Sequence, residues 1–258
     1  MKNIYIVILF SFFTIACSNP SNEHLPKTII YSGDIKNVLG LDSILIVYNN
    51  QNLIDSIFCY KNGELLQFDK IDHSNNSITA YSFNKKNNWD RDIWHSEIDL
   101  DDNNRVLKFS LFRKDTLTHI DSLIYDSKGI LSKSYSIFVD IYTKKRLPPE
   151  YESQYTYDSN NDIEKTIVYK TVGLNRNKYE EIEYKTSYPV PNFYINNSYM
   201  FFLIDHVWQD PLFGSLMSKN CMTLMKSSLS GEKTIEYTIL NDKIIERRNK
   251  NSVWYYKY

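Results

Sequence analysis

Two stretches of this sequence share one pattern: residues 125–131 read YDSKGIL and residues 157–163 read YDSNNDI. In both, tyrosine and aspartate come first, glycine or asparagine stands fifth, and an aliphatic residue stands seventh. Glycine and asparagine tolerate positive φ, and aspartate can accept a hydrogen bond from the backbone two residues further on. Each stretch therefore predicts a tight hairpin turn, followed by a strand that restarts on an inward-facing aliphatic side chain.

Three earlier stretches, at residues 48–54, 72–78 and 100–106, repeat the pattern in weaker form. The five units begin at residues 48, 72, 100, 125 and 157, so each has room for two strands and a second turn. The clearest second turn is Asn62-Gly63, which is the strongest short hairpin signal. The fifth position of the units is always asparagine or glycine: Asn52, Asn76, Asn104, Gly129 and Asn161.

The repeats predict an all-β fold, an antiparallel meander of hairpin units in one open or rolled sheet. Composition agrees, because the chain has 21 tyrosines and an aromatic content of 15%, but only 7 glycines and 7 prolines. Large side chains such as tyrosine favour strands, and asparagine and aspartate then supply the turns. Residues 187–217 interrupt the pattern. Within them, we expect a short helix or plug near residues 199–217 that covers one face of the sheet.

The Tyr-Asp units at residues 125 and 157 resemble YD-type repeats. The run at residues 212–220, followed by TIEYT at residues 234–238, is similar to a family of Bacteroidota lipoproteins. That family is a domain of unknown function with a porin-like antiparallel sheet, and the resemblance extends over residues 28–258. It implies a fold and an envelope location, and it implies no activity.

The N-terminus predicts export. Lys2 precedes an apolar run, residues 4–16, which ends on the small residue Ala16 directly before Cys17. The run has the length of a signal-peptide core and is shorter than the about 20 apolar residues that cross a bilayer as a helix. We interpret residues 1–16 as a lipoprotein signal peptide and Cys17 as the lipidated residue. The alternative is an ordinary signal peptide with an unrelated cysteine.

After cleavage, we expect residues 17–27 to form a polar tether and residues 28–258 to form one repeat-built domain. Lipid chains on Cys17 would hold the protein on a membrane. We expect an outer-membrane lipoprotein that faces the periplasm rather than the cell surface, because the tether carries one acid, Glu23, instead of an acidic cluster. The net charge of −1 indicates no nucleic-acid surface.

The sequence contains no recognisable motif for catalysis, cofactor binding or metal binding. Its five histidines have no partner at metal-ligand spacing, and residues 158–162 start like a calcium loop but are followed by Ile163, where that loop needs glycine. Cys59 and Cys221 could form a disulfide in an exported protein. Two buried thiols are favoured, because no spacing motif surrounds the cysteines. We therefore expect no enzyme, no metal and no cofactor.

A short Asp-Ser/Thr-apolar pattern occurs four times, at Ser43, Ser56, Thr116 and Ser122. It matches the signal for periplasmic O-glycosylation in Bacteroidota-type proteins. Equally, the Asp-Ser pair can end a turn while the apolar residue begins a strand. From the sequence, both interpretations stay open.

An exported sheet rich in tyrosine and tryptophan predicts a binding or scaffold module of the cell envelope, for a glycan, a peptide or another envelope protein. The candidate ligand-face residues are the tryptophans, each of which also suits core packing: Trp89, Trp94, Trp208 and Trp254. Two alternatives remain. One is an immunity or inhibitor lipoprotein that binds a secreted toxin, and the other is a hydrolase with an unrecognised carboxylate site.

Overall fold

The computed structural model describes most of the predicted domain, namely residues 25–33, 42–89, 93–140, 142–191, 198–204, 218–250 and 252–258. The predicted signal peptide, Cys17, most of the tether and Trp208 lie outside the described residues. No helix in the described ranges is long and apolar enough to cross a membrane.

The described chain is almost entirely strand, with one short α-helix, α1 (Ser198–Ile204), and one turn of 3-10 helix, η2 (Lys85–Asn87). The strands in the first half are β1 (Thr28–Gly33), β2 (Ser43–Tyr48), β3 (Ile54–Lys61), β4 (Glu64–His73), β5 (Ser77–Asn84), β6 (Trp94–Leu100), β7 (Val106–Arg113), β8 (Thr116–Tyr125) and β9 (Leu131–Val139). The remaining strands are β10 (Arg146–Tyr157), β11 (Ile163–Val172), β12 (Asn175–Pro191), β13 (Asn220–Ser227), β14 (Gly231–Thr234), β15 (Glu236–Leu240), β16 (Lys243–Arg248) and β17 (Ser252–Lys257).

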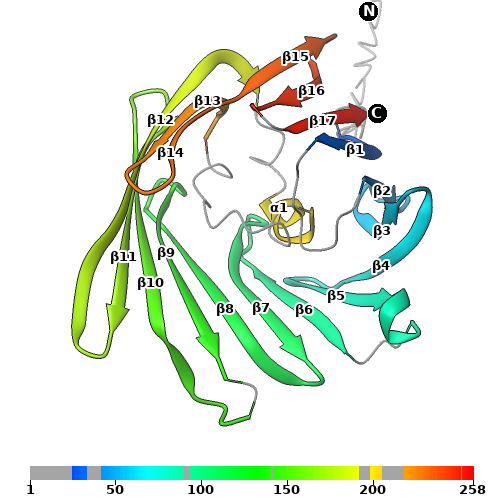
Figure 1. Cartoon of the computed structure of the whole chain (residues 1–258), viewed down its shortest axis with the longest axis horizontal. Helices are drawn as coiled ribbons and strands as arrows, with labels where there is room; N and C mark the ends of the chain where they lie inside the picture. Colours follow the sequence, from blue (N-terminus) through cyan, green and yellow to red (C-terminus); the bar gives the residue numbers. More distant parts are fainter. Residues whose placement is uncertain are drawn as a thin grey trace, which may run out of the picture.

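The strands form one antiparallel sheet that returns to its starting point. From β2 to β13, each strand pairs with the next along the chain, and β14 and β15 continue the ladder to β16 and β17. Strand β1 then pairs with both β17 and β2. Figure 1 shows the strands as a ring around α1. The predicted all-β meander is confirmed, and of the two forms left open the sheet takes the rolled one.

Isoleucines and α1 fill the inside of the ring. Ile54, Ile98 and Leu131 have no measurable exposure, and they belong to one apolar core that also contains five of the seven helix residues, Tyr199 to Leu203. Phe202 of α1 stacks on Phe109 of β7 with ring centroids 5.3 Å apart. Burying such a phenylalanine contributes roughly 1.5–3 kcal/mol. The helix agrees with the helix or plug predicted near residues 199–217. Residues 205–217 of that prediction lie outside the described residues.

The turns between units form as the repeat pattern predicts in four of the five cases. The φ angles at the fifth position are 66° at Asn52, 59° at Asn104, 80° at Gly129 and 63° at Asn161. In each of these turns, the side chain of the second residue accepts hydrogen bonds from two backbone amides: Asn49, Asp101, Asp126 and Asp158. Each of these turns is therefore stabilised by hydrogen bonds between residues of its own repeat unit.

The unit at residues 72–78 departs from the prediction, because Asn76 is not among the residues with positive φ. Its second residue is His73, which stays in β4 and cannot cap two amides as aspartate does. A shorter loop forms instead, in which the amide of Ser74 donates to the carbonyl of Ser77 at 2.9 Å.

Candidate functional site

The strand register assigns each side chain to the inner or outer wall of the ring. Directly paired residues lie on the same face of a sheet, and consecutive residues alternate. Buried Ile57 pairs with Asp69, so Asp69 faces inward. Their neighbours Phe58 and Phe68 pair with each other and face outward.

The outer wall carries a continuous row of aromatic rings. Phe68 lies at the centre of its first part, with ring centroids 5.9 Å from Phe58 and 4.6 Å from Phe83. The centroid of Trp89 lies 5.9 Å from that of Phe68. Trp89 follows η2 with a φ of 62° and is 37% exposed. Offset-stacked and tilted aromatic pairs at these distances favour each other beyond their area of burial.

A second stack extends the row across β5, β6 and β7. The His95 ring lies 5.9 Å from the ring of Tyr81 and 4.6 Å from that of Phe112, to which it is parallel within 1°. We call the two stacks together the outer ladder: Phe58, Phe68, Tyr81, Phe83, Trp89, His95 and Phe112. It spans five consecutive strands, β3 to β7.

Ion pairs lie elsewhere on the outer wall. Lys108 lies 3.1 Å from Asp99 across β6 and β7, and Arg176 lies 3.0 Å from Glu152. Lys165 of β11 pairs with Glu181 of β12. The outer wall thus carries these ion pairs as well as the ladder, together with exposed apolar residues such as Ile124.

The predicted ligand-face tryptophans do not lie together. Of the three tryptophans that the structure describes, Trp89 alone belongs to the outer ladder. Trp94 faces inward opposite Arg113, whose guanidinium carbon lies 5.6 Å from the ring centroid. Trp254 packs against the apolar core, with the guanidinium carbon of Arg247 at 4.7 Å. The tryptophans were conspicuous in the sequence, but the ladder consists mainly of phenylalanines, which only the register brings into one row.

The predicted O-glycosylation positions are spread over three strands. Ser43 and Thr116 begin β2 and β8, and both are half-buried. Ser56 in β3 is buried, and its hydroxyl donates to Asp55 at 2.8 Å. Ser122 lies inside β8 and pairs with Lys108 and Tyr135. Glycosylation at these positions stays a prediction.

Two buried acids lie on the inner wall, in β4 and β8. Asp69 accepts a 3.0 Å hydrogen bond from the side chain of Gln67, and burial raises its pKa to about 6 against the hydrogen bonds from Ser82 and Gln67. Asp121 is completely buried, contacts Nε2 of His119 at 2.8 Å and accepts a hydrogen bond from Ser136. In a hydrolytic triad, histidine lies between serine and aspartate. Here the aspartate lies between the other two, so this cluster does not have the order of a triad.

Neither the cysteines nor the turn acids assemble a metal site. Cys59 and Cys221 are not joined in a disulfide, and burial raises the pKa of both thiols, to about 11 for Cys221. Within the described part of the chain, no three histidine, cysteine or acidic side chains lie close enough to hold a metal ion.

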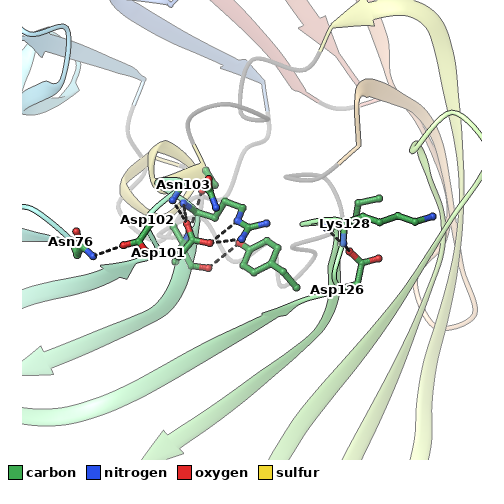
Figure 2. Close-up of polar contacts among 11 residues, drawn as sticks. Asn76, Asp101, Asp102, Asn103, Asp126 and Lys128 are labelled. Atoms are coloured by element: carbon green, nitrogen blue, oxygen red, sulfur yellow. Dashed lines mark hydrogen bonds and ion pairs between the residues drawn. The ribbon is translucent and has the colours of Figure 1, made fainter.

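Figure 2 shows the hydrogen bonds of the turn acids at the end of the ring near α1. Asp101 accepts the amide of Asn103 at 2.9 Å, and Asp126 accepts the amide of Lys128 at 2.8 Å. The side chain of Asn76 reaches across to Asp102 of the next unit, at 3.3 Å. Backbone hydrogen bonds, first from Ile130, hold the pKa of Asp126 below its usual range. These carboxylates stabilise turns.

Comparison with known proteins shows the fold. No protein-family model and no curated protein matches the sequence. Among solved structures, the chain is similar to a porin-like protein from Bacteroides uniformis ATCC 8492, with a TM-score of 0.54 and 10% identity over 91% of this chain and 96% of that one. It is also similar to a porin-like protein from Bacteroides vulgatus ATCC 8482, with a TM-score of 0.56 and 10% identity over 90% of this chain and 98% of that one. The porin-like sheet expected from the sequence is confirmed.

Proposed function

We propose that the protein is a lipid-anchored binding module of the cell envelope and that the outer ladder is its contact surface. The observation that carries this proposal is the row of stacked rings on β3 to β7 of the outer wall. Aromatic side chains are enriched at the centres of protein interfaces, and contiguous exposed apolar patches mark interaction sites. The ligand is a glycan, a peptide or an envelope protein that lays a flat apolar face on these rings.

The charges of the outer wall favour an anchor that lies outside the strands. A cationic side chain facing lipid at the bilayer midplane costs roughly 2–4 kcal/mol. Outward-facing Lys108 and Lys165 lie within their strands, in ion pairs. A wall that faces water and is tied to the membrane through lipid on Cys17 avoids this cost. We place the protein at the outer membrane, facing the periplasm.

The binding test compares Trp89→Ala and Phe112→Ala with Tyr255→Ala in the purified domain. Tyr255 is a matched control, because it is an outward-facing aromatic residue on β17 that is 38% exposed and lies outside the ladder. Binding is measured by affinity electrophoresis in gels that contain defined polysaccharides, and by sedimentation with peptidoglycan. We expect both ladder variants to weaken binding about tenfold and the control to leave it unchanged.

Binding that survives both ladder variants, with the variants folded, contradicts the proposal. If the native domain binds none of these glycans, the ligand class is protein. A photo-crosslinking residue at position 89 in intact cells should then capture a defined envelope protein, and the same residue at position 255 should not. Replacing Cys17 by serine should move the protein from the membrane fraction to the soluble fraction, which tests the anchor separately.

A further inference from the structure

We infer that the inner wall of β8 to β12 is a second binding site, which takes an acidic oligosaccharide. The site consists of one inward-facing side chain from each of the five strands, and we call it the inner shelf: His119, Phe138, Tyr151, Lys170 and Tyr179. It lies on the opposite face of the sheet from the outer ladder and on different strands, so it is independent of the function proposed above.

Register places the inner shelf on the inner wall. Asp121 pairs with Phe109, which stacks on Phe202 of α1 inside the ring. His119 lies two residues before Asp121 and therefore on the same face. Opposite His119 in β9 lies Phe138, and the two ring centroids are 4.5 Å apart.

The remaining side chains extend this row, displaced by two residues along β9. Ser136, two residues before Phe138, pairs with Tyr151 of β10, and Tyr151 pairs with Lys170 of β11. The ring of Tyr151 meets that of Tyr179 edge to face at 5.7 Å. The ammonium of Lys170 lies 5.4 Å from the centroid of the Tyr179 ring.

Two rings of the inner shelf are open to solvent, although they face inward. Phe138 is 45% exposed and Tyr179 is 43% exposed, whereas Phe109 of the same wall, next to α1, is 4% exposed. Solvation of such large rings is unfavourable in the free protein. A ligand that covers them gains this free energy.

The charge of the inner shelf favours an anion. The ion pairs of the described residues do not include Lys170. Its nearest inward acid by register is Glu180, which pairs with Val168 and accepts a hydrogen bond from Ser227. Asp121 is buried beneath the shelf and is bonded to His119 and Ser136. Lys170 is thus a cation against an aromatic ring, where a carboxylate or sulfate of a ligand can pair with it.

The size and polarity of the inner shelf select a sugar oligomer among anions. Neighbouring strands lie about 4.8 Å apart, so the four steps from β8 to β12 span roughly 19 Å. That length exceeds one ring. Along it, aromatic faces alternate with an imidazole, two phenol hydroxyls and an ammonium group. A chain of sugar rings has the same alternation of apolar ring faces and polar edges, and an acidic group on one ring meets Lys170.

The test titrates the purified domain with a uronic-acid tetramer (oligogalacturonate) and with its methyl-esterified, uncharged form, by isothermal titration calorimetry. We expect Lys170→Gln to weaken binding of the acidic tetramer about tenfold, since a hydrogen bond to a charged group is lost. It should leave binding of the esterified form unchanged, and Tyr179→Ala should weaken both. Lys165→Gln is the matched control, because Lys165 lies on the same strand but on the outer wall.

Four results would overturn the inference. The first is no binding of the acidic tetramer at millimolar concentration. The second is equal sensitivity to Lys170→Gln and Lys165→Gln. The third is binding of an aryl sulfonate on the shelf with none of the uronate, which would mean an aromatic anion instead of a sugar. A loss of uronate binding in Trp89→Ala but not in Tyr179→Ala would assign the ligand to the outer ladder. The two proposals can therefore fail separately.

Discussion

The hydroxyl of Tyr125 donates a 2.8 Å hydrogen bond to the backbone carbonyl of Val106. This bond joins the first residue of one repeat unit to the seventh residue of the preceding unit. Tyr157 makes the same 2.8 Å bond to the carbonyl of Leu131. In the unit at residues 72–78, which begins with aspartate, Nε2 of His73 contacts the carbonyl of Ile54 at 2.7 Å. The repeated tyrosine thus links neighbouring turns.

Tyr125→Phe should lower the free energy of unfolding by about 1 kcal/mol, because it removes a hydrogen bond and leaves the Val106 carbonyl without that donor. The ring, which packs under the guanidinium of Arg105 at 4.7 Å, is kept. Urea unfolding measures the change. Tyr142→Phe, at an exposed loop position, is the control and should leave stability unchanged. Equal urea midpoints for the native protein, Tyr125→Phe and Tyr142→Phe would contradict a stabilising role for this hydrogen bond.

Gly129→Ala should be more destabilising than Gly173→Ala. Both glycines have positive φ, 80° and 62°, which costs an alanine roughly 1–2 kcal/mol. At Gly129, a Cβ would also lie 2.2 Å from Nη1 of Arg105, whereas nothing lies within 4 Å at Gly173. Because Arg105 is held by Asp101, it cannot move away without losing that contact.

The excess cost at Gly129 should disappear in an Arg105→Ala background. Thermal unfolding of Gly129→Ala, of Arg105→Ala and of the double variant measures this excess cost. If Gly129→Ala and Gly173→Ala cost the same with Arg105 present, the close approach of the guanidinium is not a constraint on this turn.

Asp162→Ala should destabilise the fold by about 3 kcal/mol at pH 7. Buried Asp162 accepts hydrogen bonds from the hydroxyl of Ser218 at 2.9 Å and from the amide of Asn220 at 2.7 Å, so its loss leaves buried donors unpaired. It anchors the chain where it re-enters the sheet at β13. Ser159→Ala in the same turn is exposed and should have little effect.

The effect of Asp162→Ala should also depend on pH. Burial by itself would raise the pKa of Asp162, but the hydrogen bonds from Asn220 and Ser218 lower it overall. A carboxyl whose pKa is lowered on folding stabilises the protein above its unfolded pKa of about 3.9, and this contribution is lost as the pH falls through the folded value. The difference between native and variant proteins should therefore shrink below pH ~4. A constant difference from pH 7 to pH 3 would contradict this.

Asp69→Asn should stabilise the protein at pH 7. Burial raises the pKa of Asp69 to about 6, so the folded protein keeps this proton to higher pH than the unfolded chain. Stability then falls as the pH rises from about 4 to about 6, by a total of about 3 kcal/mol. The amide has no such penalty, although it loses part of the hydrogen bonding with Gln67 and Ser82.

Denaturant unfolding at pH 4, 5, 6 and 7 tests this effect. Native and Asp69→Asn proteins should be similar at pH 4 and diverge up to pH 6, with the variant more stable. Asp72→Asn, at an exposed position on the same strand, should follow the native curve. If the unfolding free energies of native and Asp69→Asn proteins change in parallel from pH 4 to pH 7, burial does not raise the pKa of Asp69.

Much of the fold could be predicted because its signals are local. Positive φ at Asn104 and Asn161, and the capping of each turn by the aspartate three residues before, depend on residues within one hairpin loop. At Asn76 the predicted positive φ is wrong, because His73 replaces the capping aspartate. The candidate surfaces could not be predicted, because each combines side chains from five strands, and the described tryptophans Trp89, Trp94 and Trp254 lie apart.

The sequence by itself determined the hairpin unit, its turns and its repetition, because these follow from backbone preferences and hydrogen bonds between residues a few positions apart. Only the tertiary structure decided that the sheet closes, through pairing of Ile29 with Tyr256 and Ile44. It also decided which wall each ring faces. In β3, Ile57 and Phe58 are both apolar and adjacent, and a shift of one residue would exchange their faces. Periodicity cannot separate the inner wall from the outer one where both faces of a strand are apolar. That choice depends on contacts with α1 and with strands distant in the chain.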